Sequence, residues 1–350
     1  MASLNFFIYK SLTWLFIFLC GLCGGGASLA AVEVSRNEGL LNPALFIKHA
    51  KYSGGATLET ICFDSTHEIE PGKITKIKRE GMLLKRPGAC GTLFICHGFM
   101  CSKFDCSFMR MMLPLFNIVT FDFRAHGERV DSQQCCTFGR DEASDVIAAV
   151  NYIKSRSDME GLRFCFGFSM GAVASIMAQA AEPNLFDAMV LDCPYDHSIN
   201  VIKKGLENLK FPFFGYEVPI PRDFLEQYAF QPWLQTWLKG LLKTVANMDC
   251  KGINTYIHPV SPVEAAAKIE VPCLLIHCKN DEKVPVSAAR AIFNNLKGVK
   301  RLYLTAGRNH FDSLFFYPEK YFYCINHFLE DVATLKIQHK KREKIIEDVV

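Results

Sequence analysis

The sequence predicts an α/β protein built on a mostly parallel sheet with helices on both faces. Half of its 350 residues are hydrophobic (50%), so the chain can bury a large core. After Glu33, short apolar runs bounded by Gly, Asp or Pro alternate with segments of helical periodicity. This alternation is typical of a parallel sheet with crossover helices.

The expected strands are short apolar runs with the composition of buried strands. Two early segments flank the turn at Pro71-Gly72, four central runs follow, and two more come late in the chain. The predicted strands are 58–63, 75–85, 92–96, 118–123, 162–166, 188–191, 271–277 and 301–305.

The expected helices lie between these strands. In 141–156 the apolar residues recur at helical spacing, and 171–180 is rich in Ala and Met, as in a buried helix. Two further helices are predicted near 286–296 and from Pro318 onward.

The strand–helix rhythm breaks from about residue 198 to 259. This stretch is rich in aromatic residues and proline, and its segment 233–245 is amphipathic. A long insertion between two core strands is typical of an active-site cover, so we expect a helical, aromatic lid. The alternative is an ordinary helical excursion that packs on the sheet.

The first 31 residues have the pattern of an export signal. Lys10 precedes an apolar run, Leu12 to Leu22, and small residues continue to Ala31, with cleavage expected after Ala30. The run is shorter than a typical spanning helix, but residues 6–9 could lengthen it into a retained membrane anchor. A buried N-terminal helix of a cytoplasmic protein is the alternative. The expected organisation is therefore 1–31 signal or anchor, 32–335 folded domain and 336–350 basic tail.

Charge and cysteine usage exclude several classes of protein. The formal net charge is only +3, and no stretch of dense Lys and Arg interleaves with aromatics, so nucleic acid is not an expected partner. The basic tail is expected to be a solvated helix end, with membrane contact as the weaker alternative. The fifteen cysteines fit neither a disulfide framework nor a zinc pattern, and several fall in apolar runs as small hydrophobes. No metal or cofactor is expected, and oligomeric state and cysteine redox state stay open.

A pentapeptide between a predicted strand and a predicted helix fits a nucleophile elbow. It reads Gly167-Phe168-Ser169-Met170-Gly171. The sharp strand-to-helix turn strains the backbone of the central serine, and the flanking glycines avoid clashes there. The helix N-terminus also favours negative charge that develops on the hydroxyl. A glycine-rich turn with a structural serine is the alternative.

A serine hydroxyl needs a general base, which is expected downstream in the order Ser, acid, His. His310 follows the strand predicted at 301–305 and precedes the last helix. This position suits a base better than the insertion, the final helix or the tail, where the other downstream histidines lie (His258, His327 and His339).

The acid is expected at the end of a preceding strand. Asp281 comes right after the strand predicted at 271–277 and would orient His310 and stabilise the imidazolium. Asp192, at the end of an earlier strand, is the reserve acid. Asp312 is too close in sequence to His310 to be favoured.

Two backbone N–H groups are expected to form an oxyanion hole. Met170, directly after the nucleophile, supplies one by geometry. The second is expected from the loop His97-Gly98-Phe99-Met100, where Gly98 lets the backbone approach a ligand, and Phe99 N–H is the predicted donor. His97 is then structural rather than catalytic.

These residues together carry a family resemblance. From about Leu58 to Leu329 the chain resembles α/β-hydrolases of the serine aminopeptidase-like and esterase-like branch. The resemblance rests on five motifs: His97-Gly98-Phe99, Asp122-Phe123-Arg124-Ala125-His126-Gly127, Gly167-Phe168-Ser169-Met170-Gly171, Asp281 with Val284-Pro285, and His310. It implies that residues 122–127 form a structural turn with Arg124 and His126 as scaffold. The family usually has glycine where Ala125 stands.

The expected activity is acyl transfer to water through an acyl-enzyme on Ser169. The aromatic insertion favours a carboxylic ester or thioester with an apolar acyl or aryl group, a small-molecule or lipid-like substrate. A serine peptidase or acyl-amino-acid amide hydrolase is the runner-up, since the same residues can cleave amides. A non-catalytic binding protein of this fold is the alternative from another class. With a retained anchor, the chain would be a membrane-tethered lipid hydrolase.

Overall fold

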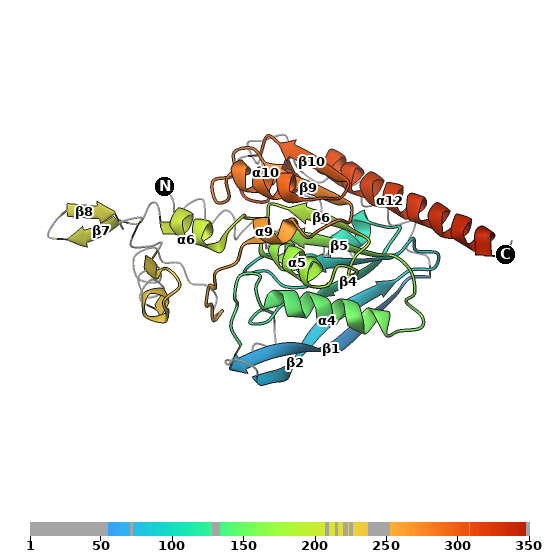
Figure 1. Cartoon of the computed structure of the whole chain (residues 1–350), viewed down its shortest axis with the longest axis horizontal. Coiled ribbons are helices and arrows are strands. Elements are labelled where there is room, and N and C mark those ends of the chain that lie inside the picture. Colours follow the sequence, from blue (N-terminus) through green and yellow to red (C-terminus); the bar gives the residue numbers. More distant parts are fainter. Residues whose placement is uncertain are drawn as a thin grey trace, which may run out of the picture.

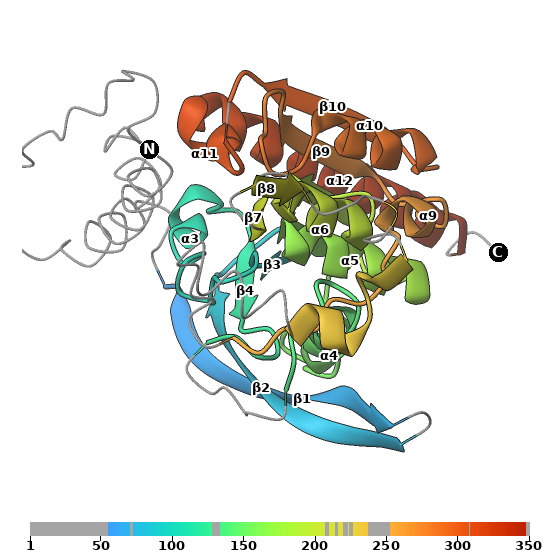
Figure 2. The ribbon, with the colours of Figure 1, turned by 90° about the vertical axis from the view of Figure 1, so that its left-hand side faces the viewer.

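The computed structural model describes residues 55–70, 73–127, 134–206, 210–213, 216–219, 223, 227–236, 253–307 and 309–347. The expected signal or anchor at 1–31 lies outside these residues, as does most of the amphipathic segment 233–245. Figure 1 and Figure 2 show a large twisted sheet with helices packed against both of its faces.

The large sheet has eight strands and is mostly parallel. β1 pairs antiparallel with β2 and β2 antiparallel with β4, and every later pair is parallel. All eight predicted strands are present, and the first two are longer than predicted because they form a ribbon of 14 and 13 residues. In sheet order the strands are β1 (Thr57–Glu70), β2 (Lys73–Lys85), β4 (Asn117–Phe121), β3 (Thr92–Cys96), β5 (Arg163–Phe168), β6 (Ala188–Asp192), β9 (Cys273–Cys278) and β10 (Lys300–Thr305).

Helices cover both faces of this sheet. Successive residues of a strand point to opposite faces, so Phe164 and Phe166 of β5 join one apolar core and Cys165 joins the other. The face with Cys165 is covered by α4 (Glu142–Lys154), α5 (Met170–Ala181), α9 (Pro262–Ala266) and α10 (Val286–Asn295). The opposite face is covered by α3 (Met109–Met112), α11 (Asp312–Phe316) and α12 (Pro318–Glu347). The end of α12 projects from the body (Figure 1).

The insertion after β6 is only partly helical in its described residues. It begins with α6 (Ser198–Leu206), and β7 (Lys210–Phe213) then pairs antiparallel with β8 (Tyr216–Pro219). This hairpin was not predicted, because prolines and irregularly spaced aromatics hide its alternation. Figure 1 shows it beyond α6, away from the large sheet.

The buried Arg124 joins the turn after β4 to β1 and α4. Its guanidinium donates to Asp145 at 2.9 Å and 3.1 Å and to the Thr66 carbonyl at 2.9 Å. Asp145 also accepts the Ser65 hydroxyl at 2.6 Å. Burial opposes ionisation of Asp145, but Arg124 outweighs it and holds the pKa of that carboxyl below its ordinary value. Arg124 is therefore a scaffold residue, as the resemblance implies.

A second buried carboxyl connects the end of β6 to α12. Asp192 Oδ2 accepts the Tyr321 hydroxyl at 2.6 Å, and both residues are fully buried. Burial raises the pKa of Asp192 to about 7, with the negative charge of Asp281 adding to the effect and the Tyr321 hydrogen bond opposing it. The carboxyl is therefore neutral in the folded protein at mildly acidic pH.

Replacing Asp145 removes the buried carboxylate to which the Arg124 guanidinium donates. We expect Asp145→Ala to lower the free energy of unfolding by about 3–5 kcal/mol, measured by urea denaturation. Asp331→Ala is the control, because Asp331 and Arg301 form an ion pair at 3.0 Å on the surface. The control is expected to change stability by less than about 1 kcal/mol. Equal losses in the two variants would contradict the assigned role of Arg124.

The raised pKa of Asp192 makes stability depend on pH. The pKa of the unfolded carboxyl is near its ordinary value of 3.8, and that of the folded one is about 7. Between these values the folded state binds a proton that the unfolded state has lost, so the contribution of Asp192 to stability falls as pH rises. Asp192→Asn cannot ionise, and its stability relative to wild type should therefore rise between pH 4 and pH 7 in urea titrations. A stability difference between the two proteins that stays constant with pH contradicts the raised pKa of Asp192.

Candidate active site

Ser169 lies at the turn between β5 and α5, where the pentapeptide predicted it. Its φ of 47° and ψ of −111° are strained for a residue with a side chain. A Cβ at Gly167 would come within 2.5 Å of Ala172 Cα, and one at Gly171 within 2.2 Å of the Cys96 carbonyl oxygen. Both glycines are therefore required by close packing. The Ser169 N–H donates to the Asp192 carbonyl at 2.8 Å, which fixes the turn to β6.

His310 contacts this serine from the loop after β10. Its Nε2 lies 2.8 Å from Ser169 Oγ, although the two residues are 141 positions apart in the chain. The next residue, Phe311, has a φ of 69°, which is unusual for an aromatic residue. The Phe311 ring lies 4.4 Å from the His310 ring and 5.9 Å from that of Phe168, between centroids. The imidazole is thus backed by packing against the strand that carries the serine.

Asp281 holds the other nitrogen of this imidazole. His310 Nδ1 lies 2.6 Å from Asp281 Oδ2, and Asp281 Oδ1 accepts the N–H groups of Lys283 and Val284 at 2.8 Å and 2.9 Å. Burial alone would raise the pKa of this carboxyl. The His310 contact and the backbone donors outweigh burial, and the pKa of Asp281 lies below its ordinary value. The aspartate is therefore charged and fixed in orientation.

His277 braces the loop that carries Asp281, and the sequence analysis did not single it out. Its Nε2 lies 3.0 Å from the Val284 carbonyl, while the Val284 N–H donates to Asp281. The ring is fully buried and 3.9 Å from Asp281 Oδ2. A histidine inside a buried strand gives no sequence signal for this contact, because it depends on how the following loop folds back.

The other candidate acids and bases make different contacts. Asp192 bonds Tyr321 rather than His310. Asp312 accepts the Asn309 N–H at 2.9 Å inside its own turn. His258 contacts Arg140 at 2.8 Å, His327 lies exposed on α12, and the side chain of His339 is outside the described residues. Of the candidate acids and bases, Asp281 and His310 are the two that are linked to Ser169 by hydrogen bonds.

The two predicted oxyanion donors come from the start of α5 and from the loop after β3. Met170 is the first residue of α5, so its N–H belongs to the first turn, which lacks intrahelical partners. Phe99 follows Gly98, where an added Cβ would lie 3.1 Å from the Phe311 ring and 3.6 Å from the Phe168 carbonyl. The loop after β3 therefore packs directly against the residues next to Ser169 and His310.

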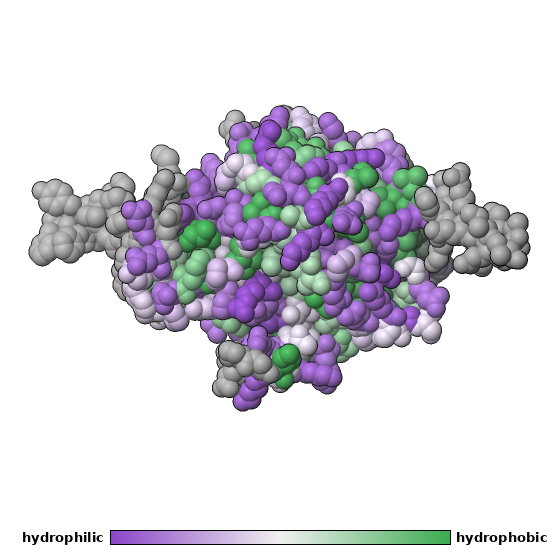
Figure 3. Space-filling view, in the orientation of Figure 1, coloured by the Kyte–Doolittle hydropathy of each residue, from purple (hydrophilic) through white to green (hydrophobic). Residues whose placement is uncertain are grey.

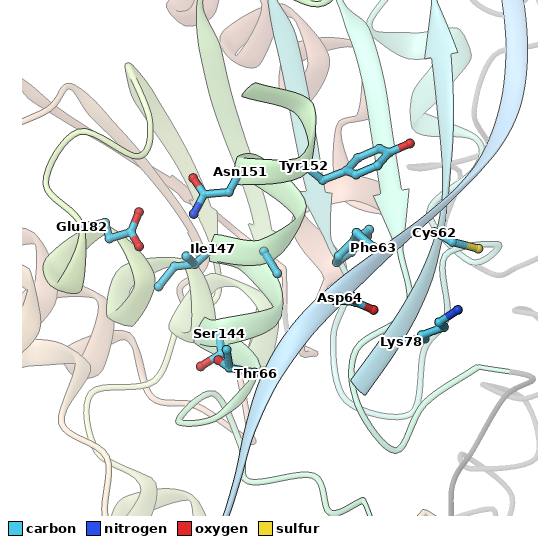
Figure 4. Close-up of a pocket in the computed structure, with 11 residues that line it drawn as sticks. Cys62, Phe63, Asp64, Thr66, Lys78, Ser144, Ile147, Asn151, Tyr152 and Glu182 are labelled. Carbon is cyan, nitrogen blue, oxygen red and sulfur yellow. The ribbon is translucent and has the colours of Figure 1, made fainter. Parts of the chain in front are cut away.

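A separate cavity of about 740 Å³ lies between β1 and α4 (Figure 4). Its lining includes Cys62 and Asp64 of β1, Lys78 of β2 and Tyr152 of α4, and none of the five predicted site residues. Among the described residues, no three His, Cys, Asp or Glu side chains are grouped as metal ligands. Within the same residues, no helix is both long and apolar enough to cross a bilayer.

Comparisons with known proteins agree with this architecture. No protein-family model matches the chain. The uncharacterized protein YqkD of Bacillus subtilis is 26% identical over 223 residues, which are 63% of this chain and 64% of YqkD. The match thus spans less than two thirds of that relative.

Solved structures give the fold. The esterase Pf2001 of Pyrococcus furiosus is 21% identical with a TM-score of 0.57, and the match covers 81% of this chain and 93% of the esterase. The acylaminoacyl peptidase of Pyrococcus horikoshii is 15% identical with a TM-score of 0.51, over 78% of this chain and 41% of the peptidase. Together with the sheet order and the turn at Ser169, these similarities show that the chain has the α/β-hydrolase fold.

Proposed function

We propose that the protein is a serine hydrolase that forms an acyl-enzyme on Ser169. The observation that carries this proposal is a pair of hydrogen bonds that link Ser169 Oγ to His310 and His310 to Asp281, at 2.8 Å and 2.6 Å. This arrangement activates a serine hydroxyl. The similarity in fold to an esterase and a peptidase also suggests a hydrolase.

The proposed reaction has two halves. His310 takes the hydroxyl proton as Ser169 attacks a carbonyl carbon, and then gives that proton to the leaving group. Water enters, His310 takes its proton, and the acyl group leaves as a carboxylic acid. Asp281 stabilises the imidazolium in each half. The Phe99 and Met170 N–H groups would bind the oxyanion of each tetrahedral intermediate.

We propose a carboxylic ester or thioester with an apolar acyl or aryl group as substrate. Aromatic rings beside the site support this choice: Phe99 and Phe138 lie 4.6 Å apart between centroids, and Phe311 packs beside His310. Apolar rings near the reacting carbonyl favour apolar substrate groups. An esterase with the same fold, Pf2001, is consistent with this chemistry.

Amide hydrolysis is the second candidate. It is favoured by the similarity in fold to an acylaminoacyl peptidase, although this chain spans only 41% of that protein. A screen of acyl chain length against matched ester, thioester and amide substrates separates the two activities. We expect the highest kcat/KM for an ester or thioester, and a preference for the amide would favour the second candidate.

The proposed location follows from residues 1–31, which we propose to be an export signal or a membrane anchor. The basic and apolar pattern of this segment supports export. Fractionation of a C-terminally tagged chain tests this proposal, because a wholly soluble and uncleaved protein would contradict it.

Replacing the nucleophile should abolish turnover without unfolding the protein. We expect Ser169→Ala to lower the hydrolysis of a short-chain aryl ester to the background rate, and to abolish labelling by a fluorophosphonate probe. Thermal denaturation of both proteins is the control for folding. Wild-type turnover in the variant contradicts the assignment, and failure of folded wild type to react with the probe favours a non-catalytic binding protein.

Two aspartates test the identity of the acid. We expect Asp281→Asn to lower kcat by about 10⁴-fold, because an amide there would favour the wrong tautomer of His310. Asp192→Asn is the matched control, since Asp192 is also buried but bonds Tyr321. Its kcat should stay within a few-fold of wild type. The reverse pattern would make Asp192 the acid.

A further inference from the structure

The predicted oxyanion donor Phe99 lies inside a tight turn after β3. The Gly98 carbonyl accepts the Cys101 N–H at 3.2 Å, which closes a four-residue turn. Met100, the third residue of the turn, has a φ of 64°. A positive φ at this position is characteristic of a type II turn, where glycine is usual. A turn with methionine at this position needs support from outside, and two histidines supply it.

His97 supports the first peptide group of the turn. Its Nδ1 lies 2.8 Å from the Gly98 carbonyl oxygen, and a carbonyl only accepts, so Nδ1 carries the proton. Its Nε2 then accepts the Phe123 N–H at 3.1 Å. His97, from the loop after β3, is thereby bonded to the turn after β4.

His126 supports the second peptide group from the opposite side. Its Nδ1 lies 2.9 Å from the Arg124 carbonyl and must donate to it. Its Nε2 accepts the Met100 N–H at 3.3 Å. The two imidazoles lie 5.2 Å apart between centroids, with 0% and 2% of their surfaces exposed. Each loop thus contributes one histidine that accepts an N–H from the other loop, and we call this pair the histidine clasp.

The clasp restrains both peptide planes that flank Phe99. The Gly98 carbonyl and the Phe99 N–H belong to one planar trans peptide, so fixing the carbonyl toward His97 fixes the N–H to point the other way. The Phe99 carbonyl and the Met100 N–H form the next plane, which His126 holds. The direction of the Phe99 N–H is therefore set by two neutral imidazoles.

From this geometry we infer that His97 and His126 are positioning residues that aim the Phe99 N–H at the oxyanion. The inference rests on the proposed hydrolase function. The hydrogen bonds of both histidines are to backbone groups of the two loops. Their contribution is expected in the transition state, where charge develops on the carbonyl oxygen.

The surroundings of the clasp keep both rings neutral. Burial lowers the pKa of His97 to about 3, with His126 adding to the effect. Burial likewise lowers the pKa of His126, where Arg79 of β2 acts in the same direction and Asp122 and Asp145 oppose it. Protonation of His126 would put a proton on Nε2, which then no longer accepts the Met100 N–H. Low pH should therefore release the turn.

The test compares His126→Phe with His126→Gln. Phenylalanine keeps an aromatic ring beside Phe99 but removes the acceptor, whereas the glutamine amide oxygen can accept the Met100 N–H. His327→Gln, on the exposed face of α12, is the control. Each protein is assayed with an aryl ester and with its thiono analogue, in which sulfur replaces the carbonyl oxygen. Because sulfur accepts hydrogen bonds weakly, the ratio of the two rates reports how well the oxyanion donors are aimed.

We expect His126→Phe to lower kcat for the oxygen ester by about 10- to 100-fold with KM little changed, less than the 10²–10³-fold for a lost donor. The rate for the thiono ester should fall much less. The ratio of the oxygen-ester rate to the thiono-ester rate should therefore fall by about ten-fold or more. His126→Gln should restore most of the ratio, and His327→Gln should match wild type. Equal losses for both esters, or a glutamine variant as impaired as the phenylalanine one, would overturn the inference.

The wild-type protein supplies a second measurement that does not depend on the folding of a variant. As pH falls, a slower attack by Ser169 affects both esters in parallel, whereas release of the turn lowers the oxygen-to-sulfur ratio. A ratio that is constant down to the pH of acid unfolding would overturn the inference. Absence of any Ser169-dependent hydrolysis in wild type would instead refute the proposed function, and the inference with it.

Discussion

The parallel ladder from β3 to β10 is the constraint on which the site depends. In this ladder Phe168 pairs with Asp192, Asp192 with Ile276, and His277 with Leu304. Because all these strands run in the same direction, the loops that follow them lie together at the carboxyl-terminal ends of the strands. Ser169, Asp281 and His310 each lie a few residues beyond a strand end, so strand register brings them within hydrogen-bond distance. A slip of one residue in any pair would turn these side chains to the wrong face.

The strands and the contacts among Ser169, His310 and Asp281 were predictable because they depend on local patterns. Central strands are buried on both faces and appear as continuous apolar runs, and a serine between a strand and a helix must occupy a tight turn. Chain order then left few positions for an acid and a base. The sequence also favoured Asp281 over Asp192 as the acid, although both residues follow a predicted strand. Only the packing of α12 shows that the carboxyl of Asp192 is occupied by Tyr321.

The features that escaped prediction leave no regular pattern in the sequence. His97 and His126 were expected to be structural, but nothing in their motifs indicates which nitrogen donates or that each accepts from the other's loop. His277 acts through a carbonyl seven residues later, after the chain has turned. The β7–β8 hairpin lacks the regular alternation that marks a strand. Positive φ at Met100, Phe138 and Phe311 is equally hidden, because neighbouring packing imposes it.

The hydrogen bond between Tyr321 and Asp192 also has a consequence for how the protein is made. The Asp192 carbonyl accepts the Ser169 N–H, while its carboxyl is bonded by a helix that begins only at Pro318. During synthesis the N-terminal parts of a chain leave the ribosome first. A nascent chain that ends before residue 321 lacks the hydroxyl that donates to the Asp192 carboxyl. The order of synthesis therefore leaves the Asp192 carboxyl without the Tyr321 hydroxyl until the start of α12 has emerged.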